Sequence, residues 1–182
     1  MGKPKILVHI CCAPDALYVV QLLQKNYDVT GYFYNPNIHP EEEYKLRLSE
    51  AKKVADFLNF SLKEEIYDPQ RWFKMVKGFE NEPEKGRRCD ICYAMRLDRT
   101  VKKAKDEGFD TFTTIMTISP WKKAQKINQI GRMLGNKHKI NFLEADFKKK
   151  DGFKKSVELS KKFNLYRQNY CGCTFSKLKI KK

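Results

Sequence analysis

The sequence predicts an α/β fold in which helices cover both faces of a parallel sheet. Short apolar or β-branched segments alternate along the chain with longer segments of helical periodicity. Turn-forming Gly, Pro and Asn residues separate the two kinds of segment. The 182 residues, 41% of them hydrophobic, suffice for one domain with its own core. We therefore expect residues 1–182 to form a single α/β domain.

The first half of the chain is expected to alternate three strands with three helices. KILVHI is a short apolar run that ends in a turn, as a buried strand does. Leu17, Val20 and Leu23 then recur at helical spacing. Pro40 and the glutamates after it suit a helix start, where the helix dipole favours acids. We predict strands at 5–10, 28–34 and 60–67 and helices at 15–26, 40–59 and 69–77.

The second half continues the alternation after a polar loop at residues 78–88. Gly108 marks the end of one helix. Ser119 and Pro120 suit the start of another, with Ser as N-cap and Pro in the first turn. We predict helices at 89–107, 120–135 and 151–163, strands at 110–115 and within 139–147, and an irregular tail from residue 164.

The six cysteines form three close pairs, which predict one thiolate-rich site built from three distant segments. A parallel sheet binds ligands at the carboxyl ends of its strands, and the first pair falls at the end of the first strand. Such a site indicates metal or redox chemistry. Taken alone, the first pair is equally explained as small buried hydrophobes. The pairs are Cys11 with Cys12, Cys89 with Cys92, and Cys171 with Cys173.

The C-x-x-C spacing of Cys89 and Cys92 places two sulfurs in the first turns of a helix, where thiolates are favoured. This motif fits a thioredoxin-type redox pair, half of a zinc site or half of a cluster site. Arg87 and Arg88 precede it. They either stabilise thiolates, bind a phosphate, or are ordinary surface charges.

Cys171 and Cys173 are separated by a single glycine, which is too tight for an unstrained disulfide bond. The pair is expected to be a redox-active dithiol or two metal ligands. Asp15 follows the first cysteine pair. It either caps the helix there or provides a hard oxygen ligand for iron.

The number and type of possible ligands favour iron over zinc. Structural zinc needs four ligands, usually at Cys/His spacings of the zinc-finger type, and this chain has no paired histidines. A 4Fe-4S cluster takes four thiolates. Two cysteines would remain for a dithiol or for part of a second metal site.

The net charge of +15 is concentrated in the second half of the chain. Residues 111–182 hold 18 Lys or Arg but only 4 Asp or Glu. Such asymmetry predicts a polyanionic partner, most commonly nucleic acid, although a solvated lysine-rich face of a heat-adapted protein would look the same. Aromatic rings beside cations favour stacking of an unpaired base. The candidate contacts are Trp121, Lys122, Lys123, Arg167 and Tyr170, together with Arg87 and Arg88.

No stretch of the chain approaches the ~18 consecutive apolar residues of a membrane helix. The apolar run near the N-terminus is too short for a signal peptide and lacks a small-residue cleavage site. We therefore expect a cytoplasmic protein with no membrane partner, where clustered cysteines usually bind metals or do redox work.

Four separated motifs resemble those of the cobalamin-independent epoxyqueuosine reductases. They are HICCAPD (9–15), GRRCDICYAMRL (86–97), TISPWKK (117–123) and YRQNYCGCTFS (166–176), in that order. The resemblance implies an adenine-nucleotide-hydrolase-like, Rossmann-like fold. It also implies reduction of epoxyqueuosine to queuosine at the wobble base of a tRNA anticodon, with an iron–sulfur cluster and an external electron donor.

The resemblance assigns the cluster to Cys11, Cys12, Cys89 and Cys92, and a redox-active role to Cys171 and Cys173, in an iron–sulfur site built from residues 9–15, 86–97 and 166–176. Many relatives have a fifth cysteine where this chain has Asp15. The first loop also lacks the Ser-Gly-Gly phosphate-binding sequence of ATP-using relatives, so we expect no ATP use.

Two hypotheses remain for the residues beyond the cluster. In one, Asp15 holds a second iron together with one or both of Cys171 and Cys173. In the other, Cys171 and Cys173 relay the second electron as a dithiol. The alternatives from other classes are a non-catalytic zinc protein that binds RNA and a thiol-disulfide oxidoreductase.

Overall fold

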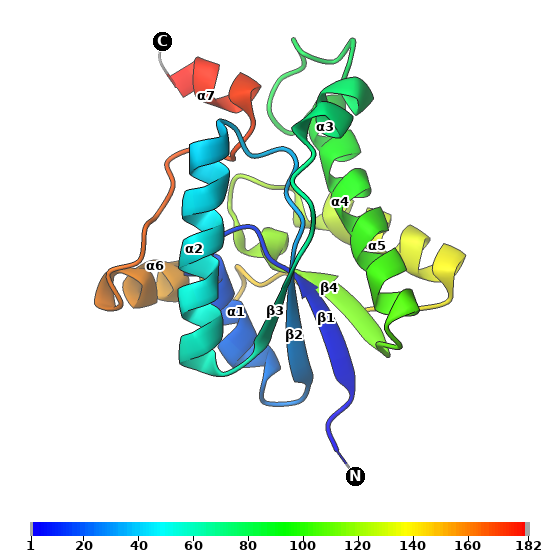
Figure 1. The fold of residues 1–182 in the computed structure, drawn as a ribbon, viewed down its shortest axis with the longest axis vertical. Coiled ribbons are helices and arrows are strands. Elements are labelled where there is room, and N and C mark those ends of the chain that lie inside the picture. Colours follow the sequence, from blue (N-terminus) through cyan, green and yellow to red (C-terminus); the bar gives the residue numbers. More distant parts are fainter. Residues whose placement is uncertain (1, 181–182) are drawn as a thin grey trace.

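A computed structural model, which describes residues 2–180, contains the predicted parallel sheet (Figure 1). The strands are all parallel and lie in the order β3-β2-β1-β4-β5. Their bounds are β1 Lys5–His9, β2 Asp28–Phe33, β3 Ser61–Glu64, β4 Thr111–Thr114 and β5 Asn141–Phe142. The predicted fold class is confirmed.

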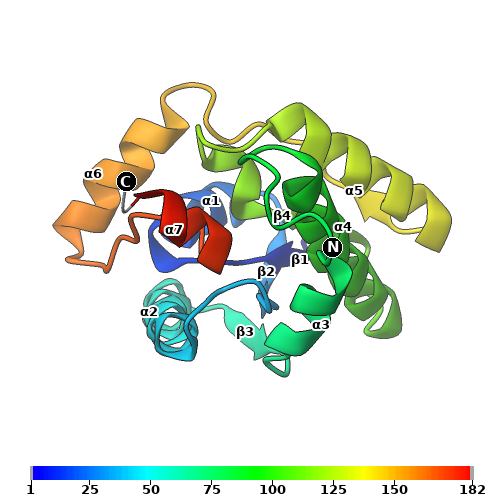
Figure 2. The same cartoon turned by 90° about the horizontal axis from the view of Figure 1, so that it is seen from above.

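Helices cover both faces of the sheet, seen from above in Figure 2. On one side α1 (Ala13–Leu23) packs against α2 (Glu41–Leu58) and α6 (Gly152–Lys162), and on the other α4 (Arg87–Asp106) packs against α5 (Ala124–His138). These two layers bury β1 from Ile6 to His9, which is why Ile6, Leu7 and Val8 are all apolar.

The strand order reverses at β1, which pairs with β2 on one side and β4 on the other. Connections from β1 and β4 therefore diverge above this strand and leave room for a ligand at its carboxyl end. The N-termini of α1 and α4 also lie at this edge. The short elements α3 (Pro69–Met75) and α7 (Thr174–Ile180) complete the same end of the molecule (Figure 1).

Two helices, α5 and α1, begin at residues other than those predicted. The predicted start of α5 at residue 120 is wrong. The chain first forms a 3₁₀ turn at Ile115–Ile118, in which the Thr114 hydroxyl accepts a hydrogen bond from the Met116 amide (3.2 Å). The helix α1 begins before Asp15, so this carboxylate lies in the first turn and does not cap the helix.

The sequence predicted an irregular tail from residue 164, but part of this tail is helical. The helix α7 begins directly after Cys173, and Phe175 within it packs beside the ring of Trp72 (5.8 Å between centroids). This aromatic contact holds the segment that carries Cys171 and Cys173 against the hydrophobic core. Of the helices within residues 2–180, none combines the length and apolar character needed to span a membrane.

The junction between the β5–α6 connection and α6 depends on a glycine. A Cβ added at Gly152 would lie 1.8 Å from the Phe147 carbonyl oxygen and 3.2 Å from the Tyr18 ring. We expect Gly152→Ala to lower the free energy of unfolding by about 1–3 kcal/mol, because backbone must shift to remove the clash. Urea denaturation measures this. Gly2→Ala, with nothing within 4 Å of the added Cβ, is the control. Equal stability of the two variants would contradict this packing.

Candidate metal-binding and active site

The six cysteines converge at the carboxyl edge of the sheet, although distant segments supply them. Cys11 and Cys12 follow β1, Cys89 and Cys92 lie in the first turns of α4, and Cys171 and Cys173 precede α7. All six are free thiols, so the disulfide bond considered for the last pair is absent. Burial raises the pKa values of the α4 pair, and the nearby Cys171 raises both further. The predicted assembly of one cysteine-rich site is therefore seen.

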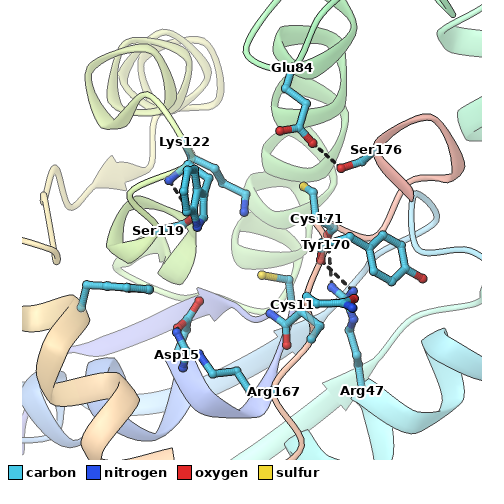
Figure 3. A pocket seen from close by; sticks show the side chains of 14 residues that line it. Cys11, Asp15, Arg47, Glu84, Ser119, Lys122, Arg167, Tyr170, Cys171 and Ser176 are labelled. Atoms are coloured by element: carbon cyan, nitrogen blue, oxygen red, sulfur yellow. Dashed lines mark hydrogen bonds and ion pairs between the residues drawn. The ribbon is translucent and has the colours of Figure 1, made fainter. Parts of the chain in front are cut away.

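A cavity of about 530 Å³ opens beside these cysteines (Figure 3). In Figure 3 the side chains of Cys11, Cys171 and Lys122 point toward its centre from three different segments. The lining residues are Cys11, Asp15, Arg47, Glu84, Ser119, Trp121, Lys122, Phe153, Arg167, Gln168, Asn169, Tyr170, Cys171 and Ser176. Seven of these were candidates from the sequence, and the other predicted site residues lie behind or beside the cavity.

The loop that carries Cys171 and Cys173 is fixed by Arg47 of α2. Its guanidinium donates hydrogen bonds to the carbonyls of Tyr170 and Cys171 (both 3.1 Å). Glu43, one helical turn earlier, accepts a further bond from its Nε (2.7 Å). The sequence did not identify Arg47 as a functional residue, since an Arg–Glu pair at this spacing usually lies on an exposed helix face.

Gly172 is required for this loop to approach the core. Its φ of +127° lies in the region that favours glycine, and an added Cβ would lie 3.0 Å from Ile38. The Gly172 carbonyl also accepts a hydrogen bond from the His39 amide (2.8 Å). The backbone between the two cysteines is thus held from both sides.

Arg88 has a structural position within the site. It is buried, and its guanidinium donates to the carbonyls of Glu80 and Glu82 in the preceding loop. It also lies over the Phe175 ring at 5.2 Å. Arg88 thus ties the loop before α4 to α7, whereas Arg87 is exposed.

Arg96 places a fully buried cation next to the cysteines. Its guanidinium donates to the Asn35 side-chain oxygen (2.9 Å), to His9 Nε2 (3.3 Å) and to the sulfur of Cys92 (3.9 Å). Burial, followed by the charge of Arg96, lowers the pKa of His9 well below its usual value, so that ring is neutral. Within residues 2–180, Arg96 has no carboxylate as an ion-pair partner.

Lys122 brings a second cation to the cavity. Burial alone would lower its pKa, but the thiols of Cys171 and Cys11 outweigh burial and raise it. In the described part of the chain it pairs with no carboxylate either. Because a buried cation needs an anion nearby, Arg96, with the half-buried Lys122 in the cavity wall, makes this a site for a negatively charged group.

The thiols respond unequally to these charges. Hydrogen bonding with Cys12 lowers the pKa of Cys11 to about 6 against the effect of burial, and Arg96 and Lys122 lower it further. Burial raises the pKa of Cys92 to about 11 and that of Cys173 to about 12. Cys11 is therefore the thiolate of its pair, and Cys92 and Cys173 would release protons on binding a metal.

The donor set fits an iron–sulfur cluster, because four thiolates around a cluster form an anionic group that the buried Arg96 and the half-buried Lys122 can neutralise. Across residues 2–180, no three His, Cys, Asp or Glu side chains lie close enough to hold a single metal ion. A cluster places several irons and sulfides between its ligands, so its thiolates lie further apart than those of a mononuclear site.

Asp15 lies at the cavity wall beside the cysteines. Its carboxylate accepts hydrogen bonds from Ser156 Oγ (3.0 Å) and from the Cys12 thiol (3.4 Å). Arg167 approaches it at 3.8 Å. The helix α6, which supplies Ser156, thereby orients a carboxylate that belongs to α1.

The residues predicted to contact RNA lie mostly around the cavity mouth. Trp121 is 71% exposed at the rim. Arg167 lies over the Phe153 ring at 5.1 Å, and the Tyr170 hydroxyl is bonded to the His39 carbonyl. Lys123 does not line this cavity and belongs to a neighbouring hollow.

Comparisons with known proteins match this chain to one family over nearly its whole length. The family model "Epoxyqueuosine reductase QueH" matches residues 6–179. An epoxyqueuosine reductase QueH from Staphylococcus epidermidis is 42% identical over 97% of this chain and 78% of its own length. One from Thermotoga maritima is 35% identical over 95% of this chain and 90% of its own.

Two solved structures share the fold at low sequence identity. A predicted subunit of a tRNA methyltransferase from Methanocaldococcus jannaschii is 15% identical, with a TM-score of 0.60 over 87% of this chain and 76% of its own. The U34-tRNA thiolase NcsA from Methanococcus maripaludis, solved with its [4Fe-4S] cluster, is 12% identical, with a TM-score of 0.58 over 97% of this chain and 63% of its own. They confirm the adenine-nucleotide-hydrolase-like fold.

The family model covers nearly the whole chain, including all three cysteine-bearing segments of the cavity. This chain therefore belongs to the QueH family of epoxyqueuosine reductases and is an oxidoreductase.

Proposed function

We propose that this chain reduces epoxyqueuosine to queuosine in tRNA by means of a 4Fe-4S cluster, without cobalamin or ATP. The observation that carries the proposal is the meeting of three cysteine pairs beside the buried Arg96 and the half-buried Lys122, in a chain of the QueH family. The neighbour NcsA, whose structure includes a [4Fe-4S] cluster and whose substrate is U34 of tRNA, supports it by analogy.

The cluster ligands in this proposal are Cys11, Cys12, Cys89 and Cys92. When bound, the cluster supplies electrons one at a time to the reaction. Arg96 donates to Cys92 and neutralises part of the ligand charge, which favours the reduced form. An external donor, which the proposal places in the cytoplasm with the tRNA, restores the electrons.

Conversion of an epoxide to an alkene breaks two C–O bonds, consumes two electrons and two protons, and releases the oxygen as water. The cluster alone accounts for one electron at a time, so a second group is needed. Either Asp15 with one or both of Cys171 and Cys173 would hold a second iron that would polarise the epoxide oxygen, or the two cysteines relay the second electron as a dithiol. Lys122 keeps a proton at Nζ and can donate a hydrogen bond to that oxygen.

The tRNA contacts proposed around the cavity combine aromatic and cationic side chains. Trp121 at the rim offers an exposed ring face for an unstacked base. Tyr170, buried in the wall with Arg47 over its ring at 5.2 Å, is proposed to contact the base that enters the cavity. Arg167, Lys122, Lys123 and the exposed Arg87 provide positive charge for the anticodon backbone. Arg88 contributes by fixing the loop in front of α4.

The rival functions leave parts of the site unexplained. A non-catalytic zinc protein would use four cysteines and leave two buried thiols idle. A thiol-disulfide oxidoreductase would use Cys89 and Cys92, yet burial raises the pKa of both, whereas such an enzyme lowers the pKa of its attacking thiol.

Loss of a cluster ligand should remove the cluster. We expect anaerobically purified Cys89→Ser and Cys92→Ser to lose most of their iron, their sulfide and the visible absorbance of the cluster, and to fail to reduce epoxyqueuosine in tRNA. Cys173→Ser, which leaves all four proposed ligands, should keep about four irons per chain. A colourless wild-type protein with stoichiometric zinc after strictly anaerobic preparation would reject the cluster.

Iron counting also separates the two hypotheses for Asp15. If it holds a second iron, the wild type should bind about five irons per chain and Asp15→Asn about four, with unchanged cluster absorbance and a loss of activity of about 100-fold or more. Ser156→Ala, which removes the hydrogen bonds from this hydroxyl to Asp15 and to the Pro14 carbonyl but keeps the carboxylate, should keep the fifth iron. Four irons in both wild type and Asp15→Asn would exclude the second iron and favour the dithiol.

Arg96 should set the reduction potential of the cluster. Arg96→Gln removes the charge and the N–H donor to Cys92, so we expect the potential to fall by on the order of tens of millivolts, while Arg96→Lys keeps the charge and shifts it less. A redox titration monitored by electron paramagnetic resonance measures this, with iron content as the check on folding. Identical potentials in all three proteins would contradict the role of this cation.

A further inference from the structure

Two hollows continue from the cavity across a lysine-rich surface. The first, of about 500 Å³, is lined by Lys122, Lys123, Lys126 and Lys148 among others. The second, of about 610 Å³, is lined by Lys25, Lys149, Lys150 and Lys155 among others. The first shares Lys122 with the cysteine-lined cavity and Asp146 with the second. The three depressions are therefore contiguous.

We propose that this surface, here called the basic track, holds the sugar-phosphate backbone of the tRNA that enters the cavity. The basic track consists of Lys25, Lys122, Lys123, Lys126, Lys148, Lys149, Lys150 and Lys155. The inference rests on the proposed function and adds to it the path of the RNA away from the reacting base.

The charges of the basic track are largely unneutralised. Lys148 pairs with Asp146 (2.7 Å) and Lys126 approaches Asp90 at 3.6 Å. Among the described residues, Lys123, Lys149 and Lys150 are exposed and form no ion pair. An electropositive groove without counter-charges attracts a polyanion.

The lysines of α2 offer a contrast to Lys123, Lys149 and Lys150. On α2, the exposed Lys45, Lys52 and Lys53 each pair with a glutamate at 2.8 Å or less. These three lysines therefore carry neutralised charges and serve as a matched comparison for the unpaired lysines of the track.

The part of the track between β5 and α6 is held in a fixed shape. Figure 2 shows this connection crossing between the start of α5 and α6. Asn128 of α5 donates to the Ala145 carbonyl (3.1 Å), and Phe147 is buried beneath the loop. Backbone bonds from Lys149 to Asp146 and from Gly152 to Lys148 close its turns. The three consecutive lysines are thus presented on an ordered platform.

Trp121 marks the point where the basic track meets the cavity. It lies next to Lys122 in sequence, and its amide is held by the Ser119 hydroxyl (3.3 Å). An RNA strand that inserts one base into the cavity must pass its flanking nucleotides over this rim. A ring 71% exposed there offers a stacking surface for an adjacent unpaired base, while the lysines bind the phosphates.

The test compares two triple variants of the cluster-loaded protein that change net charge equally. Lys123→Gln with Lys149→Gln and Lys150→Gln removes the unpaired charges of the track. Lys45→Gln with Lys52→Gln and Lys53→Gln removes paired charges on α2. Binding of a tRNA transcript with the cognate anticodon is measured over a range of salt concentrations, and KM is measured with tRNA that carries epoxyqueuosine.

We expect the track variant to bind tRNA at least about 10-fold more weakly near 0.15 M salt. The salt slope, which is the slope of the logarithm of the binding constant against the logarithm of the salt concentration, should fall in magnitude by about 2, as three lost phosphate contacts require. The α2 variant should match the wild type. In the track variant, KM should rise in parallel with the Kd for tRNA. The iron content of both variants should remain that of the wild type.

Equal weakening in both variants would show that only net charge matters and would overturn the inference, as would no change in the track variant. Failure of the two proposals can be distinguished. Turnover of epoxyqueuosine with an unchanged salt slope in the track variant would reject the basic track alone. Track-dependent tRNA binding without any turnover by the wild type would reject the proposed function alone.

Discussion

A guanidinium buried without a carboxylate costs several kcal/mol unless an anion lies close to it, and Arg96 is such a group. Neutral partners, His9 and Asn35, fix its direction without balancing its charge. The remaining contact is the sulfur of Cys92. Lys122, half-buried in the cavity wall, adds a second cation near the thiols of Cys171 and Cys11. The polar interior of this end of the molecule therefore favours an anionic ligand at the cysteines.

Topology explains how three distant segments reach one point. The switch in strand order at β1 opens the space in which Cys11 lies, and the antiparallel course of α4 brings its first turns to the same edge. The third segment has no strand to place it. Arg47 and the His39 amide hold its backbone instead, and α7 anchors it through aromatic contacts. Rigid elements thus position four cysteines, while side-chain hydrogen bonds position the two with the proposed second role.

The alternation of strands and helices was predictable, because burial on both faces leaves a clear hydrophobic pattern in β1 and β2. Convergence of the cysteines followed from the carboxyl-end rule for such sheets. The start of α5 was not predictable, since it depends on a hydroxyl of Thr114 that bonds the next turn. Arg47 and Arg96 were missed for a related reason. Their partners lie 123 and 61 residues away in the chain, and no local spacing marks such pairs.

A short segment of chain joins the proposed redox site to the proposed RNA-binding surface at the cavity. Residues after β4 provide the rim, the cation that faces the thiols and the first lysine of the surface beyond. The most direct test of the account is a single-turnover experiment in which the protein, reduced and freed of excess reductant, is mixed anaerobically with tRNA that carries epoxyqueuosine. The account predicts that the cluster is oxidised at the rate at which queuosine forms. Formation of queuosine while the cluster stays reduced, or in protein without a cluster, would contradict it.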